Sequence, residues 1–275
     1  MIGAARAGAG LESIPRLFWK RVAGAESRLL MLDYDGTLAP FRVERLEAIP
    51  LAGSIDLLRS IASSTATTVA IVSGRPVVEL ESLVAPLEVV LVGEHGWEER
   101  GRRGKTVRHP LPPKTEQGLR AAAAAVIEAG LGEHLERKRT SLMIHTRGLT
   151  SARAAAARDA CERLWAPIAD SSELALVPVN GGSELRAKGR DKGTAVRGLL
   201  ESAPPGALPV YLGDDETDED AFREIRERGF GFRVGEDDRA TLAWRRLRSW
   251  RDVPGFLRRW SSTVEGVDPV LRGEA

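Results

Sequence analysis

An apolar run that ends abruptly in two carboxylates constrains the fold more than any other feature of this chain. Residues 29–32 are Leu-Leu-Met-Leu, and Asp33, Tyr34, Asp35 and Gly36 follow directly. A short apolar run of this kind predicts a buried strand, and strands buried on both faces are typical of parallel sheets. Ligands of open α/β sheets bind beyond the carboxyl ends of such strands. The pattern therefore predicts that Asp33 and Asp35 lie in a functional site. Two solvated acids at a strand end, without a function, are the alternative, because they would show the same pattern.

A second apolar run far down the chain also ends in acids. Residues 208–212 lead through a glycine into Asp214 and Asp215, and Asp218 follows shortly after. Carboxylates that converge repel one another unless a cation lies between them, and Mg²⁺ typically takes one or two carboxylates together with substrate phosphate oxygens. A solvated helix start is the alternative for residues 214–220, since acids favour helix N-termini. Because two strands end in this way, we expect Mg²⁺ as a cofactor.

Strands and helices alternate on both sides of a different, central segment. The pattern predicts strand, helix, strand, helix and strand at 29–32, 51–63, 68–72, 76–85 and 88–92. The alternation returns with helix, strand, helix and strand at 192–202, 208–212, 217–228 and 229–234. Such alternation is typical of an α/β domain built on a parallel sheet. We therefore expect one core domain assembled from residues 1–107 and 188–275.

The central segment, residues 108–187, follows another rhythm. One Ala-rich helix is expected from Thr115 to about Gly130, and a second is expected to be capped by Thr150 and to end near Leu164. Short strands are expected between and after these helices, within 134–147 and at 174–178 and 183–187. The segment is therefore expected to form an α+β lid inserted into the core domain.

Composition narrows the class of protein. The 275 residues carry 40 Lys and Arg against 39 Asp and Glu, so the charge does not favour binding to nucleic acid or to an anionic membrane. The single cysteine excludes an internal disulfide and is typical of a reducing compartment. No apolar run approaches membrane-spanning length, and the N-terminus lacks a secretory pattern. These observations predict a cytoplasmic location without a membrane partner.

Two further loops complete a set of four motifs. Residues 69–72 are an apolar run that ends in Ser73, Gly74 and Arg75, and Lys192 lies just before an expected helix. Together with the two acidic motifs, these loops resemble those of the haloacid dehalogenase superfamily of phosphatases. The first motif of that superfamily is Asp-x-Asp-x-Thr and the fourth is Gly-Asp-Asp-x-x-x-Asp. The resemblance implies a Rossmann-like parallel-sheet core with an inserted cap.

The resemblance also implies a role for each motif residue. Asp33 is expected to be the nucleophile that forms an aspartyl-phosphate, and Asp35 is expected to be the general acid and base. Lys192 is expected to stabilise charge in the transition state. The implied phosphate-binding residues are Thr37, Ser73, Gly74 and Lys192. The implied metal ligands, direct or through water, are Asp33, Asp35, Asp214, Asp215 and Asp218.

The inserted segment resembles a type IIB cap, and local matches narrow the resemblance to the trehalose-6-phosphate phosphatase family. These matches are Leu32–Pro40, Gly93–Gly96, Leu135–Ser141 with Ile144–Arg147, and Gly213–Phe222. The chain departs from the family pattern at Thr146, where Tyr is usual, and at Ala187, where Pro is usual. Neither change touches the phosphoryl chemistry, but both leave the details of sugar recognition open.

The resemblance implies a set of substrate contacts. They are Arg75, His95, Glu136, Lys138, His145, Arg147 and Glu184. Carboxylates and cationic donors are suitable partners for sugar hydroxyls. An ordinary exposed strand pair is the alternative for Glu136 and Lys138, and a structural role is the alternative for His95.

The expected activity is Mg²⁺-dependent hydrolysis of trehalose 6-phosphate to trehalose and phosphate, and a trehalose-phosphate synthase is a candidate partner. One alternative is a related enzyme acting on another sugar phosphate, such as sucrose phosphate or mannosyl-phosphoglycerate, or a sugar phosphomutase. Another is an inactive regulatory partner of the synthase. The regulatory alternative is disfavoured because the chain keeps every catalytic motif residue, including Asp33, Asp35 and Lys192.

Overall fold

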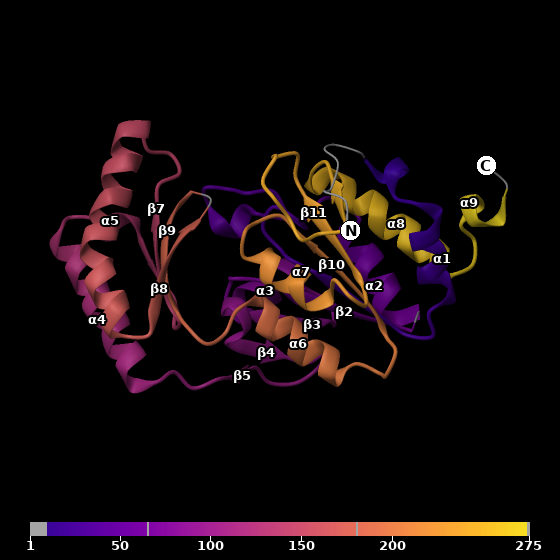
Figure 1. Cartoon of the computed structure of the whole chain (residues 1–275), viewed down its shortest axis with the longest axis horizontal. Helices are drawn as coiled ribbons and strands as arrows, with labels where there is room; N and C mark the ends of the chain where they lie inside the picture. The colour runs from indigo at the N-terminus through magenta and orange to yellow at the C-terminus, as the bar shows by residue number, and fades with distance from the viewer. Residues whose placement is uncertain (1–9, 65, 180, 274–275) are drawn as a thin grey trace. The chain divides into compact units, whose positions relative to one another are not determined.

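The computed structural model describes residues 10–64, 66–179 and 181–273, and it divides into two units (Figure 1). The larger unit consists of Met1–Val107 and Asp191–Ala275, and the smaller unit consists of Arg108–Arg190. The smaller unit is therefore an insertion in the chain of the larger one. None of the helices in the described ranges is both long and apolar enough to cross a membrane.

An eight-stranded sheet forms the centre of the larger unit. Its order is β12-β11-β10-β1-β2-β3-β4-β5; the strands from β12 to β3 are parallel, and β4 runs antiparallel to β3. The strands are β1 (Arg28–Leu32), β2 (Thr67–Val72), β3 (Val90–Gly93), β4 (Glu98–Arg100), β5 (Val107–Arg108), β10 (Leu208–Gly213), β11 (Phe230–Val234) and β12 (Arg245–Leu247). β1 lies between β10 and β2, with Leu32 level with Leu212 and Ile71. The loops after these three strands therefore start at the same edge of the sheet.

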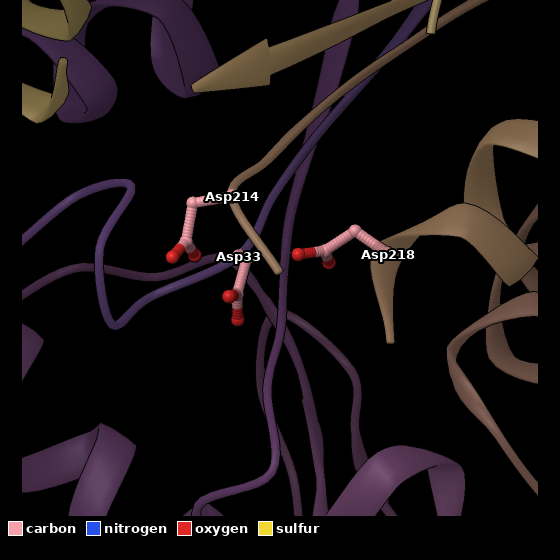
Figure 2. Close-up of side chains that lie close together, drawn as sticks. All are labelled: Asp33, Asp214 and Asp218. Carbon is pink, nitrogen blue, oxygen red and sulfur yellow. The ribbon is translucent and has the colours of Figure 1, made fainter. Parts of the chain in front are cut away.

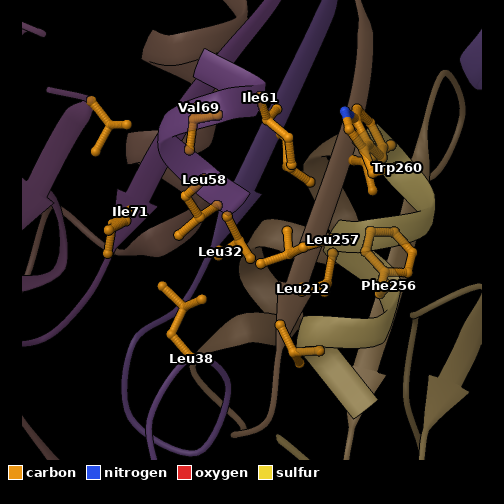
Figure 3. Close-up of a cluster of buried hydrophobic side chains, with 14 of the residues drawn as sticks. Leu32, Leu38, Leu58, Ile61, Val69, Ile71, Leu212, Phe256, Leu257 and Trp260 are labelled. Carbon is orange, nitrogen blue, oxygen red and sulfur yellow. The ribbon is translucent and has the colours of Figure 1, made fainter. Parts of the chain in front are cut away.

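Helices cover both faces of this sheet because its central strands are apolar on both sides. One face packs against α1 (Arg16–Gly24), α2 (Ser54–Ser64), α3 (Val77–Val84) and α8 (Val253–Val264). Figure 3 shows part of this core, in which Leu58, Phe256 and Leu257 lie beside Leu32 and Leu212. The other face packs against α6 (Lys192–Ser202) and α7 (Asp218–Ile225), and a short helix, α9 (Pro269–Arg272), lies near the end of the chain. This is the predicted α/β class with a central parallel sheet.

The smaller unit has an antiparallel sheet of order β6-β7-β9-β8 and two helices. Its elements are α4 (Pro113–Glu128), β6 (Leu135–Arg137), β7 (Ser141–His145), α5 (Ser151–Ser171), β8 (Leu174–Val179) and β9 (Gly182–Ala187). Leu142, Ile144 and Leu185 are buried on one face of this sheet, and Met143 lies on the other face, level with Glu136 and Glu184. The polar positions, which include Glu136 and Glu184, share the opposite face.

Helix α5 is longer than the sequence predicted. The expected end near Leu164 was wrong, because the helix continues through Pro167 to Ser171. Proline removes one backbone hydrogen bond of a helix. Trp165 is fully buried and its Nε1 donates to the Ala122 carbonyl oxygen at 3.1 Å, and Ala169 is buried one turn further on. The apolar face therefore continues past the proline, and its burial outweighs the lost hydrogen bond.

Candidate active site

Asp33 lies directly after β1, in the middle of the parallel sheet. Its backbone N–H donates to the Leu212 carbonyl oxygen at 2.9 Å, which fixes the residue between two loops. Its side chain is 7 % exposed, and Oδ1 is 3.0 Å from Lys192 Nζ. Burial raises the pKa of Asp33 to about 7; Lys192 opposes this change, whereas Asp218 and Asp35 add to it. Asp33, the more buried of the two carboxylates that follow β1, is therefore paired with Lys192.

Three carboxylates of this unit converge (Figure 2). Asp33, Asp214 and Asp218 each offer an oxygen atom, and these atoms lie within 4.8 Å of one another. Asp33 comes from the end of β1 and Asp214 from the end of β10, whereas Asp218 is the first residue of α7. The parallel register of β1 and β10 accounts for the first two, and the short turn after Asp214 returns the chain so that Asp218 faces them.

Asp218 is saturated with hydrogen-bond donors. Its Oδ1 accepts from Lys192 Nζ at 2.7 Å and from the Tyr211 hydroxyl at 2.6 Å, and its Oδ2 accepts from the Asp215 backbone N–H at 2.9 Å. Burial alone would lower the pKa of Lys192, but Asp218 and Asp33 together raise it above its usual value. The ammonium group is therefore kept charged between two carboxylates. The main structural role of Asp218 in this geometry is therefore to hold Lys192 in place.

Asp214 is the carboxylate best suited to a cation. Its Oδ1 is buried and has no hydrogen-bond partner among the described residues. Burial raises the pKa of Asp214 well above its usual value, and the charges of Asp33 and Asp218 raise it further. Gly36, at φ +79°, leaves room for this side chain, since a Cβ atom there would lie 2.2 Å from Asp214 Oδ2. Oxygen-only donors with an unpaired buried oxygen fit a hard divalent cation such as Mg²⁺.

Thr37 has the same unpaired character. It is fully buried in the turn after Asp35, and its Oγ1 has no partner among the described residues. A buried hydroxyl without a hydrogen bond is costly, and such groups usually await a ligand or water. Thr37 is therefore suited to the phosphoryl contact that the sequence predicted for it.

Asp215 is separate from the group of three carboxylates. Its Oδ1 accepts from the Glu216 backbone N–H at 2.8 Å and from Arg239 Nη1 at 3.3 Å. Arg239 also binds Asp237 at 2.7 Å, and buried Arg233 binds Asp237 at 3.1 Å. These contacts hold the loop after β11 against the loop after β10. Sequence reasoning missed this link and also missed Tyr211, for which the only available signal was an aromatic residue in the strand before Asp214.

Asp35 is held by Arg75. The guanidinium Nε and Nη2 donate to the two carboxylate oxygens at 2.6 and 2.7 Å, and Arg75 Nη1 lies 3.4 Å from Glu79. The arginine is 4 % exposed, and its Cζ lies 5.3 Å from the centre of the Tyr34 ring. Burial would lower the pKa of Arg75, but its hydrogen bonds to Asp35 raise it. Arg75, predicted as a substrate contact, thus orients the residue predicted as the general acid and base.

Ser73, Gly74 and His95 lie together in the larger unit. Ser73 follows β2 and is buried, and its Oγ accepts from the Arg75 backbone N–H at 3.2 Å. His95 follows β3 in a tight turn in which Glu94 and His95 have φ values of +46° and +55°. Left-handed backbone at residues other than glycine costs on the order of 1–3 kcal/mol each. The turn is therefore maintained by its surroundings.

The smaller unit brings together most of its predicted residues on the polar face of its sheet. His145 Nε2 lies 2.7 Å from Glu136 Oε2, and Lys138 Nζ lies 3.6 Å from Glu136 and 3.9 Å from Glu184. Glu184 is buried, and its Oε1 accepts from the Ser141 hydroxyl at 2.8 Å. Arg147 lies on the loop after β7, where its side chain packs against Gly181. These residues form a connected cluster of opposite charges, which the ordinary exposed strand pair considered above does not describe.

Comparisons with known proteins point to one family. A family model described as trehalose-phosphatase matches residues 31–243. The chain is 32% identical over 227 residues to trehalose-6-phosphate phosphatase of Escherichia coli (strain K12), covering 82% of this chain and 83% of that protein. It is 31% identical over an alignment of 281 residues to an uncharacterized glycosyl hydrolase of Mycobacterium tuberculosis, covering 91% of this chain and 20% of that protein.

The fold is also that of a solved structure. The chain matches the C-terminal domain of Candida albicans trehalose-6-phosphate phosphatase with a TM-score of 0.78 at 22% identity, covering 94% of this chain and 99% of that domain. This likeness confirms the predicted fold class, an α/β core built on a central parallel sheet with an α+β unit inserted in its chain.

Proposed function

This chain belongs to the trehalose-phosphatase family, and we propose that it hydrolyses trehalose 6-phosphate to trehalose and inorganic phosphate with Mg²⁺ as cofactor. The observation that carries the proposal is the convergence of Asp33, Lys192, Asp214 and Asp218 at one edge of the sheet within a chain of this family. A buried carboxylate beside a buried ammonium group is suited to attack on a phosphate dianion, because the cation offsets the repulsion between two anions.

The residues of the larger unit divide the reaction between them. Asp33 attacks phosphorus, so that a bond forms between its carboxylate oxygen and phosphorus while the bond from phosphorus to the sugar oxygen breaks. Asp35 gives a proton to the departing sugar oxygen and then takes a proton from the water that attacks the phosphoryl group. Lys192, Thr37, Ser73 and the Gly74 amide hold the phosphoryl oxygens. The second attack releases phosphate and restores Asp33.

Asp33 and Asp214 would hold the Mg²⁺ ion. When bound, the ion supplies positive charge that screens the phosphate and lowers the repulsion among the carboxylates. Asp218 contributes by fixing Lys192, and Asp215 contributes through its backbone N–H, which binds Asp218. The side chains of Asp35 and Asp215 are engaged by arginines, so their contribution to metal binding runs through backbone atoms or water.

The smaller unit is proposed to act as the lid that selects the sugar. A disaccharide presents mainly hydroxyl groups, and Glu136, Lys138, His145 and Glu184 offer both acceptors and donors in one cluster. Arg147, on the loop after β7, adds a further cationic donor in this unit. In this proposal the chain acts in a reducing compartment such as the cytoplasm, as its single cysteine predicts.

Phosphate release from trehalose 6-phosphate, measured with Mg²⁺ and with a chelator, tests the proposal directly. We expect release with Mg²⁺ and loss of at least 10²-fold of the rate without it, since the metal supplies much of the charge stabilisation. A panel with sucrose phosphate and glucose 6-phosphate tests the substrate. If kcat/KM on either compound equals or exceeds that on trehalose 6-phosphate, the substrate assignment is wrong. If phosphate is released from none of the three compounds, the proposed activity is wrong.

A further inference from the structure

The left-handed turn after β3 is bonded to the loop that is proposed to hold phosphate. The Glu94 backbone N–H donates to the Arg75 carbonyl oxygen at 2.9 Å, and the His95 backbone N–H donates to the Ser73 carbonyl oxygen at 3.0 Å. Two successive positive φ values are what allow both N–H groups to point at the same neighbouring loop. The turn therefore fixes the backbone on both sides of Gly74.

The His95 side chain also contacts this loop. A Cβ atom built on Gly74 would lie 2.5 Å from His95 Nε2 and 2.7 Å from His95 Cε1, distances at which real Cβ atoms essentially never occur. The imidazole ring therefore packs directly on the Gly74 backbone. His95 is 9 % exposed, so the ring has little freedom to move aside. Gly74 is required here by the neighbouring ring and not by its own backbone, because its φ lies outside the left-handed region.

The same turn also contacts the start of α6, which carries Lys192. Gly96, at φ +98°, packs on the start of α6, where an added Cβ atom would lie 3.2 Å from the Asp191 carbonyl oxygen and 3.3 Å from Ala195 Cβ. Lys192 lies between these two residues in the first turn of α6. The turn thus contacts the elements that carry Ser73 and Lys192, two of the groups proposed to hold the phosphoryl oxygens.

We propose that His95 is a positioning residue, which acts through Gly74 to hold the Ser73–Arg75 loop in its phosphate-binding shape. The inference rests on the proposed function, because it takes this loop to be the phosphoryl site. It assigns His95 a role in the larger unit that is independent of the sugar. Loss of the ring should therefore lower the rate of hydrolysis of every phosphate ester alike. Loss of a residue that contacts the sugar would lower only the rate on trehalose 6-phosphate.

Four variants test this role: Gly74→Ala, His95→Gly, the double variant and the control Gly198→Ala. Misplacing reacting groups by about 1 Å can cost 10²-fold in rate, so Gly74→Ala should lower kcat/KM about 10²-fold, and His95→Gly about tenfold. The double variant should be no worse than His95→Gly alone, because removing the ring makes room for the added methyl group. Gly198 in α6 has nothing within 4 Å of an added Cβ atom, so Gly198→Ala should keep wild-type activity.

Each rate is measured on trehalose 6-phosphate and on p-nitrophenyl phosphate, together with the inhibition constant of inorganic phosphate. Parallel losses on both esters, a raised phosphate inhibition constant and rescue in the double variant are the expected results. A loss confined to trehalose 6-phosphate, or losses that multiply to about 10³-fold in the double variant, would overturn the inference. Thermal unfolding of each variant shows whether a loss comes from unfolding; a poorly folded His95→Gly is replaced by His95→Asn, since Asn tolerates the left-handed backbone.

The outcome separates this inference from the proposed function. If the wild-type chain hydrolyses p-nitrophenyl phosphate but not trehalose 6-phosphate, the substrate assignment fails and the variant cycle is still read with the aryl ester. If it hydrolyses neither, the activity fails and the cycle is read as calorimetric binding of inorganic phosphate. Unchanged phosphate binding in Gly74→Ala and His95→Gly would then overturn the positioning role.

Discussion

At the scale of single residues, Asp33 and Asp35 differ in surroundings although they are two positions apart. Asp33 is buried beside Lys192, whereas Asp35 is more exposed and is bound on both oxygens by Arg75. A nucleophile needs a fixed position against the phosphorus atom, and an acid and base needs contact with the leaving oxygen and with water. Burial beside a cation suits the nucleophilic role of Asp33, and the greater exposure of Asp35 suits contact with the leaving oxygen and water once Arg75 releases one of its oxygens.

Replacing each carboxylate by its amide separates these roles. Asp33→Asn should lower turnover by at least about 10³-fold because the amide cannot form the aspartyl-phosphate. Asp35→Asn should still allow some phosphorylation of Asp33 but should slow both release of the sugar and hydrolysis. Rapid-quench measurement with labelled substrate checks this. Near-normal turnover in well-folded Asp33→Asn protein would rule out the covalent route.

Asp214 supplies a prediction about stability. Burial and the neighbouring charges of Asp33 and Asp218 raise its pKa, which means that its ionised form is disfavoured in the metal-free fold. The folded state therefore holds a proton that the unfolded state releases above a pH of about 4, so this group costs stability as pH rises towards neutrality. Asp214→Asn should raise the melting temperature of metal-free protein at pH 7.5 and abolish the stabilisation by Mg²⁺. Differential scanning calorimetry with and without Mg²⁺ measures both effects; a Mg²⁺ shift equal to that of wild type would remove Asp214 from the metal site.

At the scale of elements, arginines connect the loop after β11 to the loop after β10, which carries Asp214 and Asp215. Arg239 and Arg233 both bind Asp237, and their hydrogen bonds lower the pKa of that carboxylate despite its partial burial. Because the pKa of Asp237 is lower in the folded state, its ionised form stabilises the fold at neutral pH. This stabilisation is lost as pH falls through the pKa of the folded state. Glu219 in α7 adds a bond to Arg233 at 3.2 Å and accepts from the Leu242 backbone N–H at 2.7 Å. These bonds therefore join the loop and the start of α7 into one hydrogen-bonded piece.

Arg239→Ala should release Asp215 and loosen this piece. Because Arg239 is half exposed, we expect a modest loss of unfolding free energy of about 1 kcal/mol, and a several-fold weaker Mg²⁺ affinity as the Asp214–Asp218 turn becomes less ordered. Denaturant unfolding and titration calorimetry provide the two readouts. Arg223→Ala is the matched control, since Arg223 pairs only with Asp220 on the exposed side of α7 among the bonds described for it. Identical Mg²⁺ affinity in wild type and Arg239→Ala would show that this loop does not support the metal site.

The sequence predicted the elements whose pattern is local and missed those that depend on distant packing. Apolar runs with turn residues located β1, β2 and β10, because a doubly covered strand leaves a plain signal. Helix α1 was not predicted, and it is held by contacts between far ends of the chain, where Phe18 of α1 packs on Phe256 of α8 with ring centres 5.9 Å apart. Hydrogen bonds such as that between Tyr211 and Asp218 were invisible for the same reason, since a motif gives residue types but not rotamers.

At the scale of the whole molecule, the proposed function assigns chemistry and substrate choice to separate parts of the chain. The group of three carboxylates and Lys192 belong to the larger unit, and the Glu136, Lys138, His145 and Glu184 cluster belongs to the inserted one. An insertion with its own sheet and its own buried apolar face can vary its polar face without disturbing the core. The departures from the family pattern at Thr146 and Ala187 fall in this inserted unit.

This division predicts that the inserted unit can be damaged selectively. Replacing Glu136, Lys138 and Arg147 by Ala should lower kcat/KM on trehalose 6-phosphate by about 10²-fold, because sugar contacts position the substrate and help to exclude water. Hydrolysis of p-nitrophenyl phosphate should change little, since that ester has no sugar and depends on Asp33 and Lys192. Arg120→Ala, at an exposed position of α4, serves as the control within the same unit. Equal losses on both esters would mean that these side chains support folding, and the inserted unit would then have no assigned part in choosing the sugar.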